Sequence, residues 1–237
     1  MDPDMTISPL AAFKVMTFDV VGTLIDFEGG MLAYLRKSGA APSDVSDEAI
    51  LDAYRTSRTA GKTLRYPDDL ERAYFDLVRD AKLKDDAKLA RGLRDSAEFW
   101  PGFPDSAEAL KRLSSKYRLV AMTNAQRWAF EHFASTLGNP FWDSVTVDDA
   151  LCEKPDPNFF GFARGRISRS GFGRDQILHV AQSQYHDIGV AKALGYRTCW
   201  IERRKGLKGF GGTIAVEQLT APDLHFATLG ELADKAV

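Results

Sequence analysis

The stretch KVMTFDVVGT, residues 14–23, is the first strong structural signal in the chain. A short apolar and β-prone run leads to Asp19 and passes at once into a turn that contains Gly22 and Thr23. This pattern predicts a buried strand over residues 14–19. It also places a carboxylate at the carboxyl end of that strand.

Similar apolar runs recur along the rest of the chain. They are RLVAMT at 118–123, DSVTV at 143–147, ILHVA at 177–181 and RTCWIE at 197–202. Helical spacing of apolar residues occupies stretches between them, at 105–116 and 187–194. Strands that alternate with helices predict an α/β protein with a doubly wound, mostly parallel sheet.

The segment from residue 28 to residue 100 breaks this alternation and carries helix signals instead. Ser46 is a good N-cap for a helix with acidic residues in its first turn, and Pro67 is suited to open another. We therefore expect residues 28–100 to form an all-helical cap domain. Residues 1–27 and 101–237 then form one Rossmann-like core.

Composition limits the possible partners and locations. The 237 residues include 31 Lys and Arg against 33 Asp and Glu, a net charge of −2, which gives no overall attraction to nucleic acid or to an anionic membrane. Two cysteines do not make a disulfide framework. The start of the chain does not resemble a signal peptide, and no apolar run approaches the ~18 residues of a membrane span. We expect a cytoplasmic protein.

Four polar signals follow predicted strands at or just beyond their ends. They are Asp19 with Thr23, the pair Thr123-Asn124, the pair Lys154-Pro155, and the run from Gln182 to Asp187. Each alone has an ordinary explanation as a turn residue, a surface lysine or a helix cap. In open α/β sheets, however, ligands collect beyond the carboxyl ends of the strands. The four signals together therefore predict one site at that edge.

Their order resembles that of the haloacid dehalogenase superfamily over nearly the whole chain: DxxGT, then T-N, then K-P, then a last aspartate. The resemblance implies that Asp19 attacks the substrate and forms a covalent ester with it. It also implies that Thr123 orients the charged group of the substrate and that Lys154 neutralises the Asp19 carboxylate. An ammonium beside Asp19 is expected to lower the pKa of that carboxyl group.

Two departures from the phosphatases of this superfamily favour another branch. Val21 stands where they carry a second aspartate, which protonates the leaving group, and Asp187 is the only acid in AQSQYHD, where they hold Mg²⁺. A 2-haloacid dehalogenase needs neither feature, so the resemblance implies hydrolysis of a carbon–halide bond without metal or cofactor. In that reaction Asp187 orients or deprotonates the water that opens the ester.

The resemblance also suggests residues that bind the substrate and the halide. Dehalogenases use a cap arginine together with the asparagine of the second motif, and Arg55 and Asn124 occupy those places. The alternative is that Arg55 or Arg58 is a solvated surface charge. Thr23 is expected to help bind the substrate carboxylate or to hold the loop.

Three further residues have less regular matches. Ser183 is expected to be a hydrogen-bond partner of Lys154. Phe160 stands in the substrate site where relatives commonly have a tyrosine, so it fills space without a hydroxyl group. His186 is a candidate second base, although local hydrogen bonding is the commoner role for a histidine at a helix start.

Two alternatives to the dehalogenase remain open. One is a phosphate- or phosphonate-directed hydrolase of the same fold, and the other is a catalytically idle relative that serves as a binding subunit. We expect a small anionic substrate and no nucleic-acid or membrane partner, and the resemblance suggests a homodimer.

Overall fold

The computed structural model describes residues 10–59 and 64–237. Within these residues the core is a six-stranded parallel sheet with the order β3-β2-β1-β4-β5-β6. The strands are β1 (Val15–Phe18), β2 (Arg118–Met122), β3 (Asp143–Val145), β4 (Ile177–Ala181), β5 (Arg197–Ile201) and β6 (Leu224–Phe226). The predicted doubly wound α/β fold is confirmed. Only β6, a short edge strand, was not predicted.

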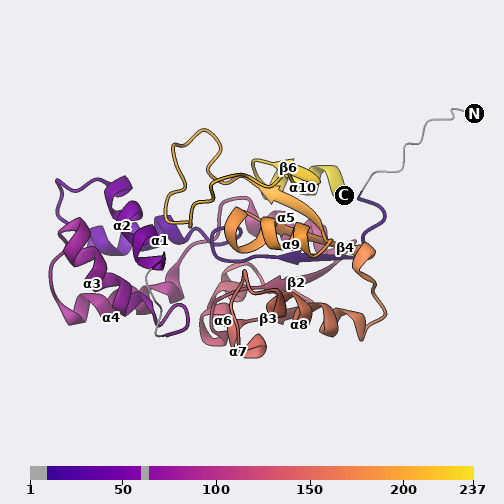
Figure 1. Ribbon diagram of the computed structural model, residues 1–237, viewed down its shortest axis with the longest axis horizontal. Helices are drawn as coiled ribbons and strands as arrows, with labels where there is room; N and C mark the ends of the chain where they lie inside the picture. The colour runs from indigo at the N-terminus through magenta and orange to yellow at the C-terminus, as the bar shows by residue number, and fades with distance from the viewer. Residues whose placement is uncertain (1–9, 60–63) are drawn as a thin grey trace, which may run out of the picture.

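Helices cover both faces of the sheet (Figure 1). Successive side chains of a strand point to opposite faces. Val15 accordingly packs in one apolar cluster with α8 (Pro157–Ser168), whereas Met16 and Phe18 belong to a second cluster with α5 (Ser106–Ser114) and α10 (Leu229–Ala236). The remaining helices of the core are α6 (Arg127–Thr136), α7 (Val147–Ala150) and α9 (Gly189–Ala193), with short turns at Arg174–Gln176 and Gln184–Ile188.

The segment 28–100 supplies no strand to the sheet among its described residues. Its helices are α1 (Phe27–Lys37), α2 (Asp47–Thr59), α3 (Leu70–Ala81) and α4 (Ala87–Ser96), followed by a 3₁₀ turn at Ala97–Phe99. Figure 1 shows these four helices together at one end of the molecule, beyond the carboxyl end of β1. Ser46 accepts a hydrogen bond from the Ala49 amide at 3.2 Å, as a cap should, whereas the helix expected at Pro67 begins three residues later, at Leu70.

Trp100 joins the helical segment to the core. Its ring is buried and stacks on Phe133 of α6 with 6.4 Å between centroids, and it also packs against Phe27 of α1. A Cβ atom on Gly30 would lie 2.4 Å from the indole, so only glycine lets α1 approach so closely. The two parts therefore share one continuous apolar cluster.

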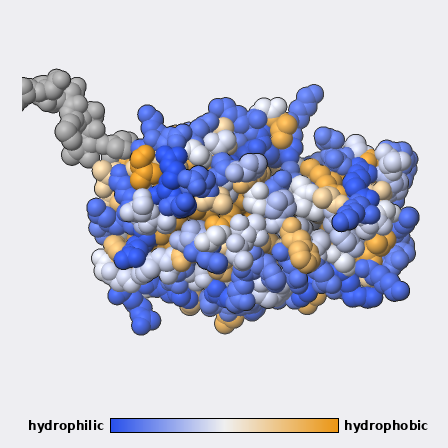
Figure 2. Space-filling model, turned by 180° about the vertical axis from the view of Figure 1, so that it is seen from behind, coloured by the Kyte–Doolittle hydropathy of each residue, from blue (hydrophilic) through white to orange (hydrophobic). Residues whose placement is uncertain are grey.

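The surface seen in Figure 2 is mostly polar, with apolar side chains in separate patches. None of the helices in the described ranges is both long enough and apolar enough to cross a membrane. Cys152 and Cys199 are both free thiols, and burial raises the pKa of the Cys199 thiol far above its usual range.

Candidate active site

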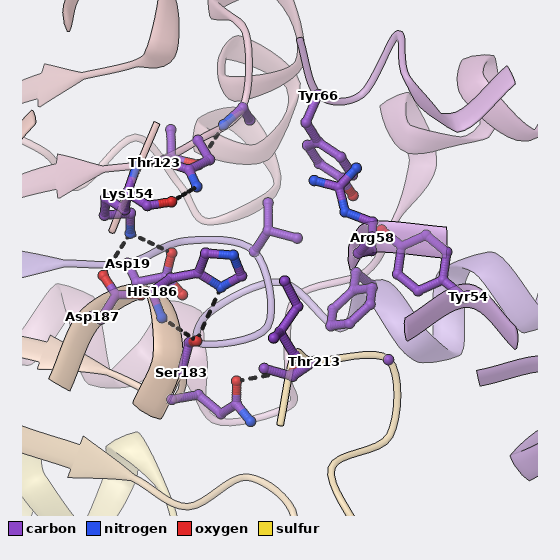
Figure 3. A pocket seen from close by; sticks show the side chains of 17 residues that line it. Asp19, Tyr54, Arg58, Tyr66, Thr123, Lys154, Ser183, His186, Asp187 and Thr213 are labelled. Atoms are coloured by element: carbon purple, nitrogen blue, oxygen red, sulfur yellow. Dashed lines mark hydrogen bonds and ion pairs between the residues drawn. The ribbon is translucent and has the colours of Figure 1, made fainter. Parts of the chain in front are cut away.

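The four polar motifs meet at the carboxyl edge of three adjacent strands. Asp19 follows β1, Thr123 follows β2, and Asp187 lies in the turn after β4, because the strand order β2-β1-β4 makes these ends neighbours. Lys154 reaches the same place from the loop before α8. Together with Asn124 they line one cavity of about 80 Å³ (Figure 3).

Lys154 is the centre of the site. Its ammonium is 2% exposed and donates to Asp19 Oδ1 at 2.8 Å, to Asp187 Oδ1 at 2.6 Å and to the Met122 carbonyl at 2.8 Å. The three N–H groups of the ammonium are thereby all used. The contact with both carboxylates agrees with the predicted role of Lys154 beside Asp19.

The predicted bond between Ser183 and Lys154 is wrong. Ser183 Oγ instead accepts the His186 amide at 3.0 Å and lies 3.1 Å from His186 Nδ1. Lys154 has no donor left, and the hydroxyl is needed as the N-cap of the turn Gln184–Ile188. That turn has the wider geometry of a π-helix. The α-helix that was predicted to start at residue 187 therefore starts at Gly189.

Thr23 holds the Asp19 carboxylate and does not reach the cavity. Its hydroxyl is buried, donates to Asp19 Oδ2 at 2.6 Å and accepts the Gln182 amide at 2.8 Å. Of the two roles expected for Thr23, holding the loop is therefore the one that its contacts support.

The two carboxylates of the site differ in acidity. Burial raises the pKa of Asp19 above its usual value, and the opposing effect of the Lys154 charge is smaller. The pKa of Asp19 is therefore raised, whereas the sequence analysis expected Lys154 to lower it. Burial would also raise the pKa of Asp187, but the charge of Lys154 and a hydrogen bond from His179 lower it to about 2. Asp187 is therefore the carboxylate that stays ionised most firmly.

His179 is a site residue that the sequence analysis missed. It lies in the middle of β4, fully buried, with Nε2 3.0 Å from Asp187 Oδ1 and Nδ1 2.8 Å from the Thr17 hydroxyl of the neighbouring strand. Because an ionised carboxylate only accepts hydrogen bonds, Nε2 is the donor. Asp187 Oδ2 is buried without a hydrogen-bond partner among the described residues. A single polar residue in the apolar run ILHVA was the available signal.

Asn124 lies in the cavity wall, as predicted, but its amide is partly committed to the backbone. Its Oδ1 accepts the Lys154 amide at 2.7 Å, and its Nδ2 donates to the Lys154 carbonyl at 2.9 Å. The side chain thus fixes the loop that carries Lys154. An amide nitrogen has two N–H groups, so the second can still serve a ligand.

Arg55 is not the arginine of the cavity. It donates to the Gly211 carbonyl at 2.6 Å and pairs with Asp52 at 2.7 Å, whereas Arg58 lines the cavity and pairs with Asp69 at 3.1 Å. The two arginines are one helical turn apart on α2, so both point to roughly the same side of the helix. The loop around Gly211 occupies the place beside Arg55, and this leaves Arg58 at the cavity.

Phe160 is also outside the cavity, contrary to the prediction. It is 1% exposed and packs in the core, with its ring 5.3 Å from that of His179 and 5.9 Å from that of Tyr196. Helix α8 packs on the face of the sheet that carries Val15, so Phe160 in its first turn lies in that core layer and not in the cavity wall. Phe160 can affect the site only through His179.

The glycine-rich loop after β5 also contributes to the cavity. Its tip at 205–209 is exposed, but Gly212, Thr213 and Ile214 line the cavity. The Gly212 amide donates to Glu28 Oε1 at 2.8 Å, and a Cβ atom on Gly212 would lie 2.9 Å from the Phe27 ring. Glycine thus allows the loop to close against α1 and α2.

Besides polar side chains such as Gln182, the cavity wall has a large apolar and aromatic part. Val21, Phe27, Tyr54, Tyr66 and Ile214 face the space above Asp19. Asp19 and Asp187 are the only carboxylates that line it, and residues 10–59 and 64–237 contain no cluster of three or more His, Cys, Asp or Glu side chains suited to a metal ion.

Comparison with known proteins agrees with this fold and these motifs. Residues 13–195 match the family model of the haloacid dehalogenase-like hydrolases, and the chain therefore belongs to that family. The chain is 25% identical to (S)-2-haloacid dehalogenase 4A of Burkholderia cepacia over 199 residues, which cover 81% of this chain and 84% of the relative. It is 24% identical to haloacetate dehalogenase H-2 of Moraxella sp. (strain B), over 80% of this chain and 86% of that protein. The structure of L-2-haloacid dehalogenase from Xanthobacter autotrophicus superposes with a TM-score of 0.72 at 18% identity, over 94% of this chain and 97% of that one, which shows the shared fold.

Proposed function

We propose that this protein is a 2-haloacid dehalogenase, which converts a short 2-haloalkanoic acid into a 2-hydroxy acid and halide. One observation carries the proposal: Lys154 links Asp19 to Asp187 in a small cavity where the residue two positions after Asp19 is Val21. A hydrocarbon side chain cannot protonate a leaving group, and a halide needs no proton to leave. The names of the two curated relatives above support the same reaction.

In the first step a carboxylate oxygen of Asp19 attacks C2 of the substrate. The C–halogen bond breaks as the new C–O bond forms, the halide leaves with the electron pair, and C2 is inverted. Lys154 and Thr23 hold the attacking carboxylate in one orientation, since each binds a different oxygen. The product of this step is an ester of Asp19.

In the second step water attacks the carboxyl carbon of the Asp19 ester. Asp187 takes a proton from the water, and the unpartnered Oδ2 is the oxygen available for this contact. Lys154 stabilises the negative charge of the tetrahedral intermediate. The intermediate collapses with cleavage of the bond to the alkoxide oxygen, which takes the proton held by Asp187, and the 2-hydroxy acid is released. Asp19 is left as a carboxylic acid that contains the oxygen of the water, and it loses its proton to solvent to become a carboxylate again.

The size of the cavity supports a substrate with few carbon atoms. Its volume of about 80 Å³ is little more than half the ~150 Å³ of an engineered cavity that takes up benzene. The walls offer Arg58 and Asn124 for anionic groups and Thr123 as the residue that orients the carboxylate, with apolar contacts around C2. Such a site fits the size and charge of chloroacetate or 2-chloropropionate.

A phosphate- or phosphonate-directed reaction of Asp19 is the second candidate. The observation in its favour is that His186 lines the cavity and has an ionisable ring within reach of a leaving group. In this candidate His186 protonates the leaving group. In the phosphatases an aspartate at the position of Val21 has that role.

We further propose that residues 28–100 act as the cap domain of a core formed by 1–27 and 101–237. In support, α2 supplies Tyr54 and Arg58 to the cavity, and the segment before α3 supplies Tyr66. By analogy with the family we propose a cytoplasmic homodimer that works without metal or cofactor.

Halide release tests the proposal directly. The purified protein is incubated in EDTA with chloroacetate and with each enantiomer of 2-chloropropionate, and phosphate release from a panel of phosphate esters is measured with and without Mg²⁺. We expect halide release that EDTA does not reduce, and its loss in the variant Asp19→Asn. Phosphate release that requires Mg²⁺, without halide release, would establish the second candidate. Absence of both activities would favour an idle binding relative.

A further inference from the structure

Tyr66 presents a buried hydroxyl group that has no hydrogen-bond partner in the part of the chain that the structure describes. The residue is 5% exposed, lines the cavity, and its hydroxyl makes no hydrogen bond within the described residues. After burial, the nearby Tyr54 is the next cause of the raised pKa of Tyr66, but no hydrogen bond of standard geometry joins the two side chains. Because a buried polar group without a partner is costly, it calls for a functional explanation.

The surroundings of Tyr66 suit an anion. The Arg58 guanidinium lies 5.3 Å from the centre of the Tyr66 ring, and Arg58 also lines the cavity. Burial raises the pKa of Tyr66 well above its usual value, so its hydroxyl keeps the proton that it needs in order to donate. A neutral donor beside a cation is a favourable place for a small negative ion.

The position of Tyr66 relative to Asp19 indicates which anion it meets. Figure 3 shows Tyr66 and Arg58 on the side of the cavity away from Asp19 and Lys154. In a displacement at a saturated carbon, the leaving group departs on the side opposite to the nucleophile. A substrate attacked by Asp19 therefore directs its halogen toward the wall that holds Tyr66.

We propose that the Tyr66 hydroxyl donates a hydrogen bond to the departing halide, an inference that rests on the dehalogenase function proposed above. A carbon-bound halogen is a weak acceptor, and its negative charge develops only as the bond breaks. The bond from Tyr66 therefore strengthens in the transition state, and it accelerates the step instead of only tightening substrate binding.

The effect of Tyr66 should depend on the halogen. A smaller halide carries its charge in a smaller volume, so it attracts the hydroxyl proton more strongly. Removal of the hydroxyl should consequently slow the release of chloride more than bromide, and bromide more than iodide. A residue that only fills space affects the three leaving groups equally.

The test compares Tyr66→Phe with the unchanged protein on chloroacetate, bromoacetate and iodoacetate, with kcat/KM and the single-turnover rate of ester formation as readouts. We expect a loss of roughly 10- to 100-fold for chloroacetate and less than about 3-fold for iodoacetate. The melting temperature should not fall, because the hydroxyl has no partner to lose. Tyr74→Phe is the matched control, since its hydroxyl donates to the Lys84 carbonyl at 2.6 Å, away from the cavity. This control should lose stability and keep the ratio of the three rates.

Each result decides the proposal. Halide release by the unchanged protein, combined with an equal loss or no loss for all three substrates in Tyr66→Phe, would overturn the role of Tyr66 and leave the dehalogenase function standing. Absence of halide release from the unchanged protein would overturn both. The role of Tyr66 would be supported if Tyr66→Phe loses more rate on chloroacetate than on bromoacetate and iodoacetate, with an unchanged melting temperature.

Discussion

Replacing Lys154 with methionine removes the ammonium from between two buried carboxylates while keeping a side chain of similar length. Lys154 is 2% exposed, and it contacts Asp19 at 2.8 Å and Asp187 at 2.6 Å. The variant leaves both carboxylates in the interior without their common partner. Its consequences for stability can be worked out from the acidities of the site.

The pairing of Asp187 is reflected in its pKa of about 2, against an ordinary value of 3.8. Because this pKa lies below the ordinary value, the ionised Asp187 stabilises the folded protein at neutral pH by an amount on the order of 2 kcal/mol, part of which comes from His179. Burial of the carboxylates without compensation adds a further cost, and loss of one partner from a buried ion pair generally costs about 3–5 kcal/mol. We expect Lys154→Met to lose stability within that range at pH 7.5.

The pH dependence of this loss has a definite sign. In the unchanged protein the contribution of Asp187 is complete above the unfolded pKa near 3.8 and disappears as the pH falls toward 2. In the variant, burial without the ammonium raises the pKa of both carboxyl groups above their unfolded values, so protonation stabilises the folded state as the pH falls. The difference between the two proteins should therefore narrow between pH 7.5 and pH 4.5.

Urea denaturation at several pH values measures both effects. Lys111→Met, which alters an exposed lysine of α5, is the control and should change the free energy of unfolding by less than about 0.5 kcal/mol. A deficit below about 1 kcal/mol in Lys154→Met at pH 7.5, or one that stays constant with pH, would refute the reasoning from the buried triad.

Four other substitutions test three separate parts of the site. His179→Phe removes the bond to Asp187, and we expect it to slow hydrolysis of the ester by roughly 10-fold or more, so that mass spectrometry detects accumulated ester during turnover; an unchanged rate would contradict the role of His179. Gly212→Ala places a Cβ atom 2.9 Å from the Phe27 ring of the cavity wall, so we expect KM to rise by about 10-fold in steady-state kinetics. An unchanged KM would show that this loop does not shape the cavity. Arg58→Lys should lower kcat/KM by about 100-fold while Arg55→Lys lowers it by less than about 3-fold, and the reverse order would restore Arg55 as the arginine of the site.

Much of the fold could be predicted because its signals are local. Each of the five predicted strands is an apolar run closed by a polar or turn residue, and all five are present with shifts of one or two residues at their ends. The strand β6 was missed because its three residues, LHF, are partly exposed and do not form an apolar run. The π-helical turn after β4 depends on the Ser183 cap and on its surroundings, which no spacing rule encodes.

The convergence of Asp19, Lys154 and Asp187 was also predictable, since each follows a strand or a loop that ends at the same edge of the sheet. What failed was the choice among residues whose role depends on packing. Arg55 and Arg58 lie one helical turn apart, so their spacing does not show which of them reaches the cavity. The loop at Gly211 decides this, because it binds Arg55 and leaves Arg58 at the cavity. The buried position of Phe160 depends on which face of the sheet its helix covers, and that is a property of the whole fold.

Buried polar residues were the hardest part of the site to predict from the sequence. His179 lies within the predicted strand ILHVA, and Tyr66 directly precedes Pro67, where a helix was expected to begin. Their importance appears only when the neighbours are known: Asp187 at 3.0 Å for His179, and the absence of any hydroxyl partner within the described residues for Tyr66. Such residues are found by accounting for hydrogen bonds in three dimensions.

The central claim, that Asp19 forms an ester, is tested most directly by a single turnover in H₂¹⁸O. Enzyme in excess over (S)-2-chloropropionate is allowed to react once in labelled water that contains EDTA, and the peptide containing Asp19 and the released acid are analysed by mass spectrometry. The ester route predicts ¹⁸O in the carboxylate of Asp19 and unlabelled oxygen in the 2-hydroxyl group of the product. Labelled product beside an unlabelled Asp19 would show that water attacks the substrate directly and would contradict the account.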